Sequence, residues 1–250
     1  MSAVERGSRR LNDGAASGPH PLRSRLSGPV EEAARALLGA RLVREDSSGL
    51  RVGRVVEVEA YDGPADLASH ARFGRHGRTA RNAVMLGPAG VAYVYLVYGM
   101  YDCLNVVSGI EGEASACLIR AIEPVHGIEP MRAARLANAL SRRRSRETNS
   151  RLTEERLARL PVERLASGPG LVTAALGIDR SLNGLDLLDP TSPLRLEPAP
   201  DSSEAAEDRS REVGTSPRLG IDYAGPPWTE LPWRFYLADS PALSGPRGTR

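Results

Sequence analysis

The sequence predicts a fold that mixes β-strands with α-helices, and two stretches carry most of this prediction. Residues 53–61 (GRVVEVEAY) alternate valines and glutamates, and a period of two is the pattern of a β-strand. Residues 91–107 contain two strand-like runs on either side of Tyr98-Gly99-Met100-Tyr101, and a glycine between such runs indicates a hairpin. Segments with helix start and stop signals lie before and after these strands, so we expect both kinds of element.

Local signals predict the other elements in chain order. Acids in the first turn and Gly39 after the end indicate a helix at 31–38. The break at Asp62-Gly63-Pro64 ends the long strand, and 66–70 resembles the start of a helix. A strand at 116–122 carries one charge, Arg120, for which Glu59 or another carboxylate is the natural partner. We further expect strand pieces at 41–43 and 50–52, helices at 127–144, 154–160 and 171–176, a turn and strand within 182–197, and closing strands at 218–223 and 233–237.

Composition suggests three divisions of the chain. Residues 1–28 are rich in Ser, Gly, Pro and Arg without periodicity, so we expect a flexible basic tail. Residues 29–244 form the expected domain, within which the polar, acidic stretch 198–215 is predicted to be a mobile surface loop. Residues 245–250 are expected to be a C-terminal tail.

The composition also limits the class of protein. With 250 residues, the chain suffices for one large domain or two small ones. Its two cysteines, Cys103 and Cys117, are too few for a disulfide framework and lack the spacing of metal ligands, which fits a reducing, cytoplasmic setting. No run of about 18 apolar residues predicts a membrane span, and no segment resembles a secretory signal. The net charge of +2 permits nucleic-acid binding but does not argue for it.

The long strand and the turn after it bring together side chains suited to acid–base chemistry. Because successive strand residues point to opposite faces, Glu57, Glu59 and Tyr61 share a face, and His70 follows after the turn. Carboxylates and histidine are common general acids and bases. Two other interpretations stay open. The glutamates also fit the exposed face of an edge strand, and their separation of about 7 Å also fits the paired carboxylates of a sugar hydrolase.

Three further features suggest contact with a nucleic acid or an anion. Tyr98 lies at the predicted hairpin tip, where a large ring is poorly placed to join a core and is suited to wedge between bases. The arginine-rich stretch 72–82 fits a phosphate-contacting loop, or simply a solvated loop. Residues 167–170 (SGPG) open a helix whose free N–H groups suit a phosphate, or mark an ordinary helix start.

Beyond these separate features, the chain resembles a known family. Several blocks are similar to those of the methylpurine-DNA glycosylases, also called alkyladenine or 3-methyladenine DNA glycosylases, and they follow the family's order from about Ala34 to Ser244. The matching blocks are ARALLGARLVR, GRVVEVEAYDGPADLASHA, GRTARNAVMLGPAG, AYVYLVYGMYDCLNVV, LIRAIEP, SGPG with ALGI, RLGIDYAG and WRFYLADSPALS.

The resemblance implies a single α+β domain in which helices surround a curved antiparallel β-sheet and a β-hairpin protrudes. It implies a glycosylase of base excision repair that flips alkylated or deaminated purines out of double-stranded DNA. A glutamate-activated water would then hydrolyse the N-glycosidic bond and leave an abasic site. The substrate class would be 3-methyladenine, 7-methylguanine, hypoxanthine and ethenoadenine. The alternative is a protein that binds DNA lesions without catalysis.

The resemblance also implies roles for individual residues at the base. Glu59 matches the general base that activates water, and Arg120 matches the arginine that helps to hold this water. Leu243 matches the region of a backbone carbonyl that also contacts the water. Asn105 matches the pocket residue that disfavours the amino group of normal guanine. The residues that match those enclosing the flipped base are Tyr61, His70 and Tyr95.

For the DNA itself, Tyr98 matches the intercalating wedge, Met100 lies beside it, and the expected phosphate contacts are Arg75, Arg78 and Arg81. The expected partner is double-stranded DNA with damaged purines, bound by a cytoplasmic monomer (at the nucleoid, if bacterial) with no metal, cofactor or membrane. All 33 basic residues are arginine, so no lysine Schiff base can form. Attack by water is therefore expected, without cutting of the strand.

Overall fold

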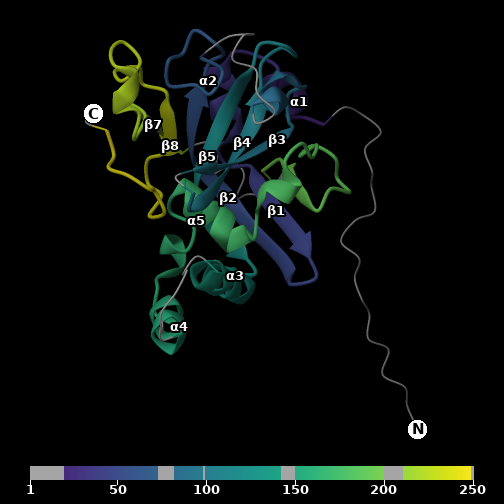
Figure 1. Cartoon of the computed structure of the whole chain (residues 1–250), viewed down its shortest axis with the longest axis vertical. Coiled ribbons are helices and arrows are strands. Elements are labelled where there is room, and N and C mark those ends of the chain that lie inside the picture. The colour runs from purple at the N-terminus through teal and green to yellow at the C-terminus, as the bar shows by residue number, and fades with distance from the viewer. Residues whose placement is uncertain (1–19, 73–81, 98, 142–149, 200–210, 249–250) are drawn as a thin grey trace.

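The strands form one antiparallel sheet with helices packed around it, in a computed structural model that describes residues 20–72, 82–97, 99–141, 150–199 and 211–248 (Figure 1). This arrangement confirms the predicted α+β class. The helices are α1 (Arg23–Leu26), α2 (Val30–Leu37), α3 (Ile128–Ser141), α4 (Ser150–Ala158) and α5 (Pro169–Leu176), with 3-10 turns at Ala83–Leu86, Val162–Arg164, Arg180–Leu182 and Asp222–Ala224. The strands are β1 (Arg41–Asp46), β2 (Gly49–Tyr61), β3 (Ala92–Val97), β4 (Tyr101–Ser108), β5 (Ser115–His126), β6 (Leu194–Glu197), β7 (Val213–Ser216) and β8 (Arg234–Leu237).

The long strand β2 lies at the centre of the sheet. The sheet has the order β3-β4-β5-β2-β1-β6, while β8 also pairs with β2 and β7 pairs with β8. β1 covers one edge of β2 as far as Arg54, and β8 continues along that edge from Glu57 to Glu59. β5 pairs with the opposite edge of β2. Both glutamates are 0% exposed, so the interpretation as the solvent face of an edge strand is wrong.

The pairing of β2 with β5 is irregular beside these glutamates. Val55 lies opposite Ile122, Glu57 opposite Ala121, and the register shifts again before Val58. Arg120 therefore falls at an irregular step of β5. Such β-bulges bend a strand and redirect side chains. Here the irregularity accompanies an arginine that reaches both Glu57 and Glu59.

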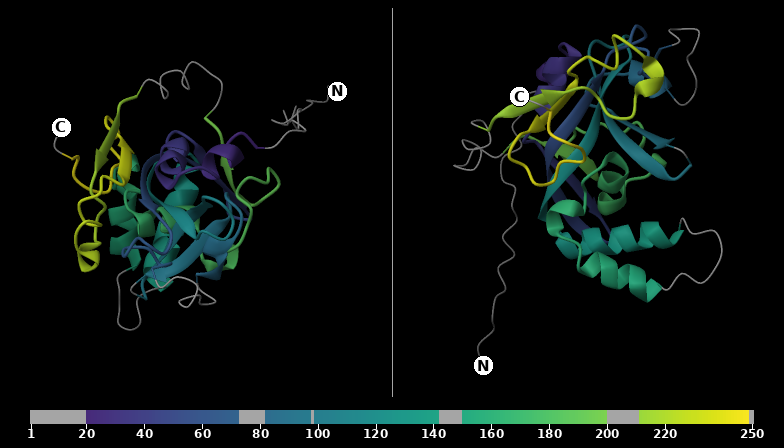
Figure 2. Two further views of the ribbon diagram at one scale, coloured as in Figure 1. Left: turned by 90° about the horizontal axis from the view of Figure 1, so that it is seen from above. Right: turned by 90° about the vertical axis from the view of Figure 1, so that its left-hand side faces the viewer.

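Helices cover the sheet through apolar faces with helical spacing. α2 buries Val30, Ala33, Ala34 and Leu37, which are spaced i, i+3, i+4 and i+7. α5 packs against β4 and β5. The α3–α4 pair and the free end of the β3–β4 hairpin project to the same side of the molecule (Figure 2, right). Among the described helices, none is long and apolar enough to cross a membrane.

The predicted tails and loop are more ordered than expected where the structure describes them. Residues 20–28 contain α1, whose Leu26 is buried in the main core together with Leu22. Two residues of the predicted C-terminal tail bind the domain: the Pro246 carbonyl accepts from Arg234, and the Gly248 N–H donates to Tyr236. In the predicted loop, 213–216 form β7. Apolar burial and one strand pairing, which composition does not reveal, order these segments.

Two predicted elements are absent from the described structure. Residues 66–70 form turns, because the buried Asp66 carboxylate accepts from the Ala68 N–H and binds Arg218 instead of starting a helix. Residues 218–223 contain no strand. There the side chain of Arg218 is buried in an ion pair with Asp66, and Asp222 begins a 3-10 turn.

Candidate active site

An aromatic-lined cavity opens between the β3–β4 hairpin, the start of α5 and the loop after β7. Its volume is about 630 Å³. A smaller recess of about 50 Å³ shares four of its lining residues and reaches toward β4 and β5. The lining residues common to both are Tyr61, His70, Tyr95 and Tyr223. The structure therefore brings together the three side chains predicted to enclose a base.

The rings of this cavity hold one another in place. The His70 ring centroid lies 4.4 Å from that of Tyr95 at an interplanar angle of 68°. Tyr93, behind them, lies 5.3 Å from Tyr95, and its hydroxyl is 2.9 Å from Nδ1 of His70. Edge-on pairs of this kind are favourable because the positive edge of one ring meets the negative face of another. The wall of the cavity is thus preorganised for a flat, aromatic group.

Tyr61 connects this wall to Glu59. Its hydroxyl donates to Oε2 of Glu59 at 2.9 Å, and burial, followed by the Glu59 charge, raises the pKa of the Tyr61 phenol. The guanidinium of Arg218 lies 4.7 Å from the ring centroid of Tyr61 and is held by the buried Asp66. Tyr61 is therefore fixed both at its hydroxyl and at its ring.

Glu59 lies directly behind the cavity wall. Its Oε1 accepts from the backbone N–H of Leu219 at 2.7 Å, and its Oε2 accepts from Arg120 Nη1 at 3.1 Å as well as from Tyr61. All three donor residues line the cavity, whereas Glu59 itself does not. A carboxylate has about four acceptor positions. Because described groups occupy three of them, Glu59 retains capacity for one further donor.

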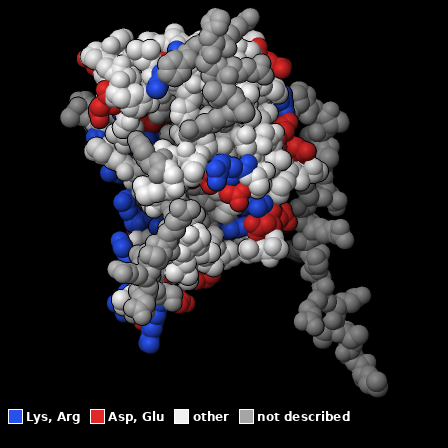
Figure 3. Space-filling view, in the orientation of Figure 1, with Lys and Arg blue, Asp and Glu red and all other residues white. Residues whose placement is uncertain are grey.

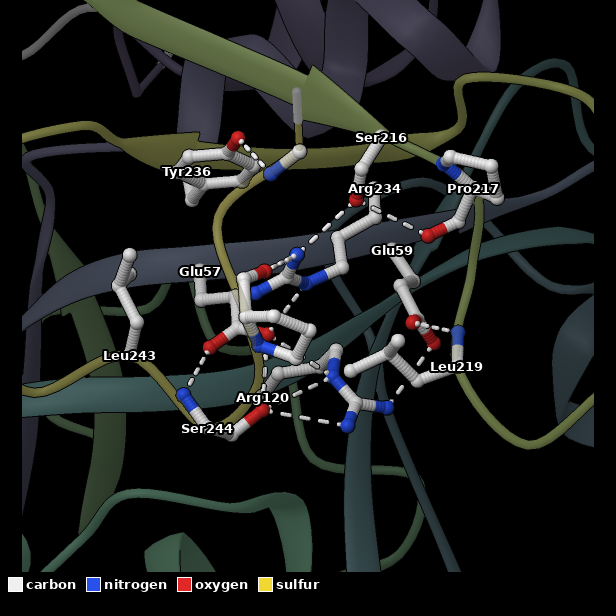
Figure 4. A network of polar contacts seen from close by, with 12 residues as sticks. Glu57, Glu59, Arg120, Ser216, Pro217, Leu219, Arg234, Tyr236, Leu243 and Ser244 are labelled. Atoms are coloured by element: carbon white, nitrogen blue, oxygen red, sulfur yellow. Dashed lines mark hydrogen bonds and ion pairs between the residues drawn. The ribbon is translucent and has the colours of Figure 1, made fainter.

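Glu57 is enclosed in an ion-pair network on the other side of Arg120 (Figure 4). Its Oε1 accepts from Arg234 Nε at 2.7 Å and from Arg120 Nε at 3.1 Å, and its Oε2 accepts from the Ser244 N–H at 2.6 Å. Burial opposes ionisation, but Arg234, the Ser244 N–H and Arg120 together lower the pKa of Glu57. The Ser244 hydroxyl donates to Oε1 as well, at 2.8 Å. Glu57 is thus an ionised carboxylate with donors at both oxygens, and it does not line the cavity.

Arg120 is shared between the two carboxylates. Burial disfavours its charge, but Glu59 and then Glu57 outweigh that effect and raise the pKa of Arg120. Arg120 lines the cavity, so its positive charge borders the space where a substrate would bind. The predicted Arg120–Glu59 ion pair is present, and Glu57 is a second partner that the sequence interpretation did not assign to it.

Asn105 lies at the floor of the smaller recess. It is 4% exposed, and its Nδ2 donates to the Tyr93 carbonyl at 3.1 Å. Met85 and Ala116, also buried, line the same recess. The Asn105 amide is therefore held in a fixed position in the lining of the recess.

Leu243 does not lie at the cavity. Its side chain packs in a small cluster with Val56 and Ala121, and its carbonyl accepts from Ser167 Oγ at 2.9 Å. The residue next to Glu59 is Leu219, which belongs to the RLGIDYAG block and lines the cavity. The structure thus places Leu219, and not the predicted Leu243, beside Glu59 and the cavity.

Tyr223 is a second residue that sequence reasoning missed. It comes from the same block, is 62% exposed, and lines both the cavity and the recess. Its hydroxyl donates to the Ala68 carbonyl at 3.0 Å, and the Arg72 guanidinium lies 5.5 Å from its ring centroid. Tyr223 lies outside the long strand and the hairpin that supplied the predicted base-enclosing tyrosines, so no local pattern indicated it.

Most of the predicted DNA contacts lie outside the described residues, namely Tyr98, Arg75, Arg78 and Arg81. Met100, beside the hairpin tip, is 55% exposed. On the face shown in Figure 3, arginines lie along the left edge down to α4, and acidic side chains mix with basic ones on the right. This face therefore carries no single continuous basic surface among its described residues.

Another cavity, of about 490 Å³, lies beside the turn that follows β2. Its lining includes the carboxylates of Asp62 and Glu113, and none of its described lining residues is aromatic. Burial, and then the charge of Glu31, raise the pKa of Asp62. Carboxylates repel phosphate, and the described lining residues offer no stacking partner for a base. In the described part of the chain, no three His, Cys, Asp or Glu side chains gather as metal ligands.

Comparisons with known proteins agree with the geometry. Residues 24–241 match the family described as methylpurine-DNA glycosylase. A mouse protein named DNA-3-methyladenine glycosylase is 42% identical over 218 residues, covering 86% of this chain and 58% of its own length. Two bacterial relatives whose names include 3-methyladenine DNA glycosylase come from Alkaliphilus oremlandii (38% identical, covering 86% of this chain and 94% of the relative) and Myxococcus xanthus (41% identical, 86% and 89%). The chain belongs to the methylpurine-DNA glycosylase family of DNA repair hydrolases.

Proposed function

We propose that the protein removes alkylated or deaminated purines from double-stranded DNA by hydrolysing their N-glycosidic bond. The observation that carries this proposal is an aromatic-lined cavity with Arg120 in its wall and Glu59 directly behind, bound to Arg120. The family and the names of its relatives support the same chemistry. A purine enters such a cavity only after it leaves the helical stack, which requires flipping of the nucleotide.

The cavity selects its base by stacking and by charge. The rings of Tyr61, His70 and Tyr95 offer a slot whose faces attract a cation by about 0.5–2 kcal/mol each. A purine methylated at N3 or N7 is positively charged, so it binds this slot well and leaves the sugar readily. Deaminated purines are neutral, and their selection depends on stacking and on easier extrusion from weakened pairs.

Glu59 is the general base in this proposal. The water binds at the remaining acceptor position of its carboxylate, between Arg120 and Leu219. Glu59 takes a proton as the water oxygen attacks C1′ of the sugar, and the purine leaves with the electrons of the broken C–N bond. Arg120 holds the Glu59 carboxylate through its Nη1 and orients the water. A positioned general base contributes about 10²–10⁴-fold to a rate.

The product of this reaction is an abasic site in an intact strand. Cutting the strand through a Schiff base requires an amine nucleophile, and the chain contains no lysine. The described lining of the cavity contributes hydroxyls, rings, the Cys103 thiol and a guanidinium but no primary amine, which fits hydrolysis.

The test is single-turnover base release from duplexes that each carry one lesion, with enzyme in excess. Each reaction is divided, and half receives heat and alkali. We expect free base in both halves and strand cutting only after alkali. Cutting without alkali would contradict the monofunctional mechanism. Tight binding to lesions with no base released would instead establish a lesion-binding protein.

A further inference from the structure

We propose that the C-terminal segment 242–248 completes the active site, and that Ser244 and Glu57 are positioning residues for Arg120. This inference rests on the proposed function, in which Arg120 and Glu59 hold and activate the water. It assigns a task to a segment that lies 124 residues from Arg120 in sequence and does not line the cavity.

Ser244 contacts both members of the ion pair behind Glu59 (Figure 4). Its hydroxyl donates to Glu57 Oε1 at 2.8 Å and accepts from Arg120 Nε and Nη2, each at 3.2 Å. A serine hydroxyl has one donor and two acceptor positions. All three positions are used, so the hydroxyl has a single orientation in which it holds Arg120.

The planar guanidinium transmits this constraint to Glu59. Arg presents its N–H groups in a rigid fork. Ser244 and Glu57 hold the Nε edge of Arg120, which leaves Nη1 directed at Glu59 Oε2 at 3.1 Å. If the Nε edge were released, Nη1 would no longer have a fixed direction.

Glu57 is held in turn from its other side. Arg234, which is 0% exposed, donates its Nε to Glu57, and its Nη1 donates to Ser216 Oγ at 2.9 Å and to the Pro246 carbonyl at 2.7 Å. Charges therefore alternate along Arg234, Glu57, Arg120 and Glu59. Arg120 therefore has one carboxylate on each side. The C-terminal segment contacts the other end of this series, because the Pro246 carbonyl accepts from Arg234.

The backbone of the C-terminal segment is anchored on both sides of Ser244. Ala242 and Leu243 are buried against Val56 and Ala121 of β2 and β5. The Leu243 carbonyl accepts from Ser167 at the start of α5, and the Gly248 N–H donates to the Tyr236 hydroxyl at 2.8 Å. These contacts fix the backbone on both sides of Ser244. Leu243 thus acts as an anchor for Ser244, and not as a water ligand.

The test compares Ser244→Ala with Ser244→Thr and with Ser240→Ala. Ser240 is a matched control, because it is a buried serine just before this segment, and its hydroxyl accepts from the Ala242 N–H at 3.2 Å and has no described contact with Arg120 or Glu57. With a hypoxanthine-containing duplex under single turnover, we expect Ser244→Ala to lower the rate of base release by about tenfold, the equivalent of one lost hydrogen bond. DNA affinity should stay at the wild-type value, Ser244→Thr should restore the rate, and Ser240→Ala should leave it unchanged.

A second readout does not depend on activity. In ¹⁵N-labelled protein, the Arg120 Nε–H signal should exchange with water faster in Ser244→Ala than in wild type or in Ser240→Ala. Equal exchange and equal base release in the two alanine variants would overturn the proposal. If the wild-type protein released no base, the proposed function would fail, and the exchange rates would still decide whether Ser244 holds Arg120.

Discussion

Glu57 and Glu59 are the same residue type, two positions apart on one strand, yet the fold gives them different surroundings. Both are 0% exposed. Glu57 binds two arginines and both polar groups of Ser244, and none of its oxygens borders the cavity. Glu59 binds one arginine, one phenol and one backbone N–H, all from residues of the cavity wall.

The difference shows why one buried carboxylate stabilises the fold while its neighbour is available for the reaction. Burial of a charge is costly unless partners compensate for it. At Glu57, four described hydrogen bonds compensate for the charge, and two arginines supply two of them. At Glu59, three hydrogen bonds do so, all from residues that line the cavity, which leaves capacity for a donor from that side. Arg120 couples the two, because it donates Nε to Glu57 and Nη1 to Glu59.

The largest expected effect is that of Glu59→Gln on catalysis. The variant cannot take a proton from water, so single-turnover base release should fall by about 10²–10⁴-fold. The affinity for lesion-containing DNA, measured by fluorescence anisotropy, should remain, because the cavity rings are unchanged. Base release at the wild-type rate would remove Glu59 from the mechanism.

Glu57→Gln should show a different pattern from Glu59→Gln. We expect a large decrease in the free energy of unfolding and a smaller decrease in the rate of base release. An amide at this position places an N–H group against donors and leaves Arg234 without a carboxylate in the described structure. Breaking a buried pair from one side costs about 3–5 kcal/mol. Chemical denaturation should therefore show a greater loss of unfolding free energy for Glu57→Gln than for Glu59→Gln.

The same pair of variants tests the sugar-hydrolase alternative. In that mechanism both carboxylates take part in the chemistry, so both variants would lose activity equally. An equal loss of base release, in variants shown to be folded by near-ultraviolet circular dichroism, would revive it. We expect a loss of rate for Glu57→Gln that is far smaller than for Glu59→Gln.

The contrast between the two glutamates shows which features could be predicted from the sequence. The strands could be predicted, whereas the burial of these side chains could not. Strand alternation predicted β2, and a glycine between two strand runs predicted the β3–β4 hairpin, because both signals are local. The burial of Glu57 depends on Arg234 and Ser244, which lie 177 and 187 residues away. Period-two alternation is identical for an exposed edge and a buried centre, so no local pattern separates them.

Three residues of the cavity wall were predictable from two matched blocks. Tyr61, His70 and Tyr95 were assigned from the resemblance, and the structure places all three around one cavity. Leu219 was missed and Leu243 assigned instead, since each lies in a matched block just after a short strand, β7 or β8, and only the tertiary contact of Leu219 with Glu59 distinguishes them.

A smaller effect is expected for Tyr61→Phe, with Tyr95→Phe as the matched control. Both tyrosines line the cavity, but of the two only Tyr61 is seen to donate its hydroxyl to Glu59. Loss of that hydrogen bond, worth about 1 kcal/mol, should slow base release by about fivefold. Tyr95→Phe keeps the stacking ring and should change the rate less. Similar rates for the two variants would indicate that the Tyr61 hydroxyl does not assist Glu59.

The smallest effect that we expect is a pH dependence of the unfolding free energy that arises from the titration of Glu57. Its pKa is lowered from an ordinary value of 4.5, so the native state prefers the ionised form. The contribution of Glu57 to stability is therefore complete above about pH 4.5 and is lost as the pH falls through the lower native pKa. Glu57→Gln lacks this carboxylate and so lacks its titration.

The difference in unfolding free energy between the wild-type protein and Glu57→Gln should accordingly be constant near neutral pH. This difference should narrow below about pH 4.5, where Glu57 becomes protonated in the unfolded wild-type protein while it is still ionised in the native state. Denaturation curves at several pH values between 7 and 3 measure this difference. A difference that stays constant down to pH 3 would mean that Glu57 is not held in its ionised form by Arg234 and Ser244, and the contrast with Glu59 would then rest on access to the cavity alone.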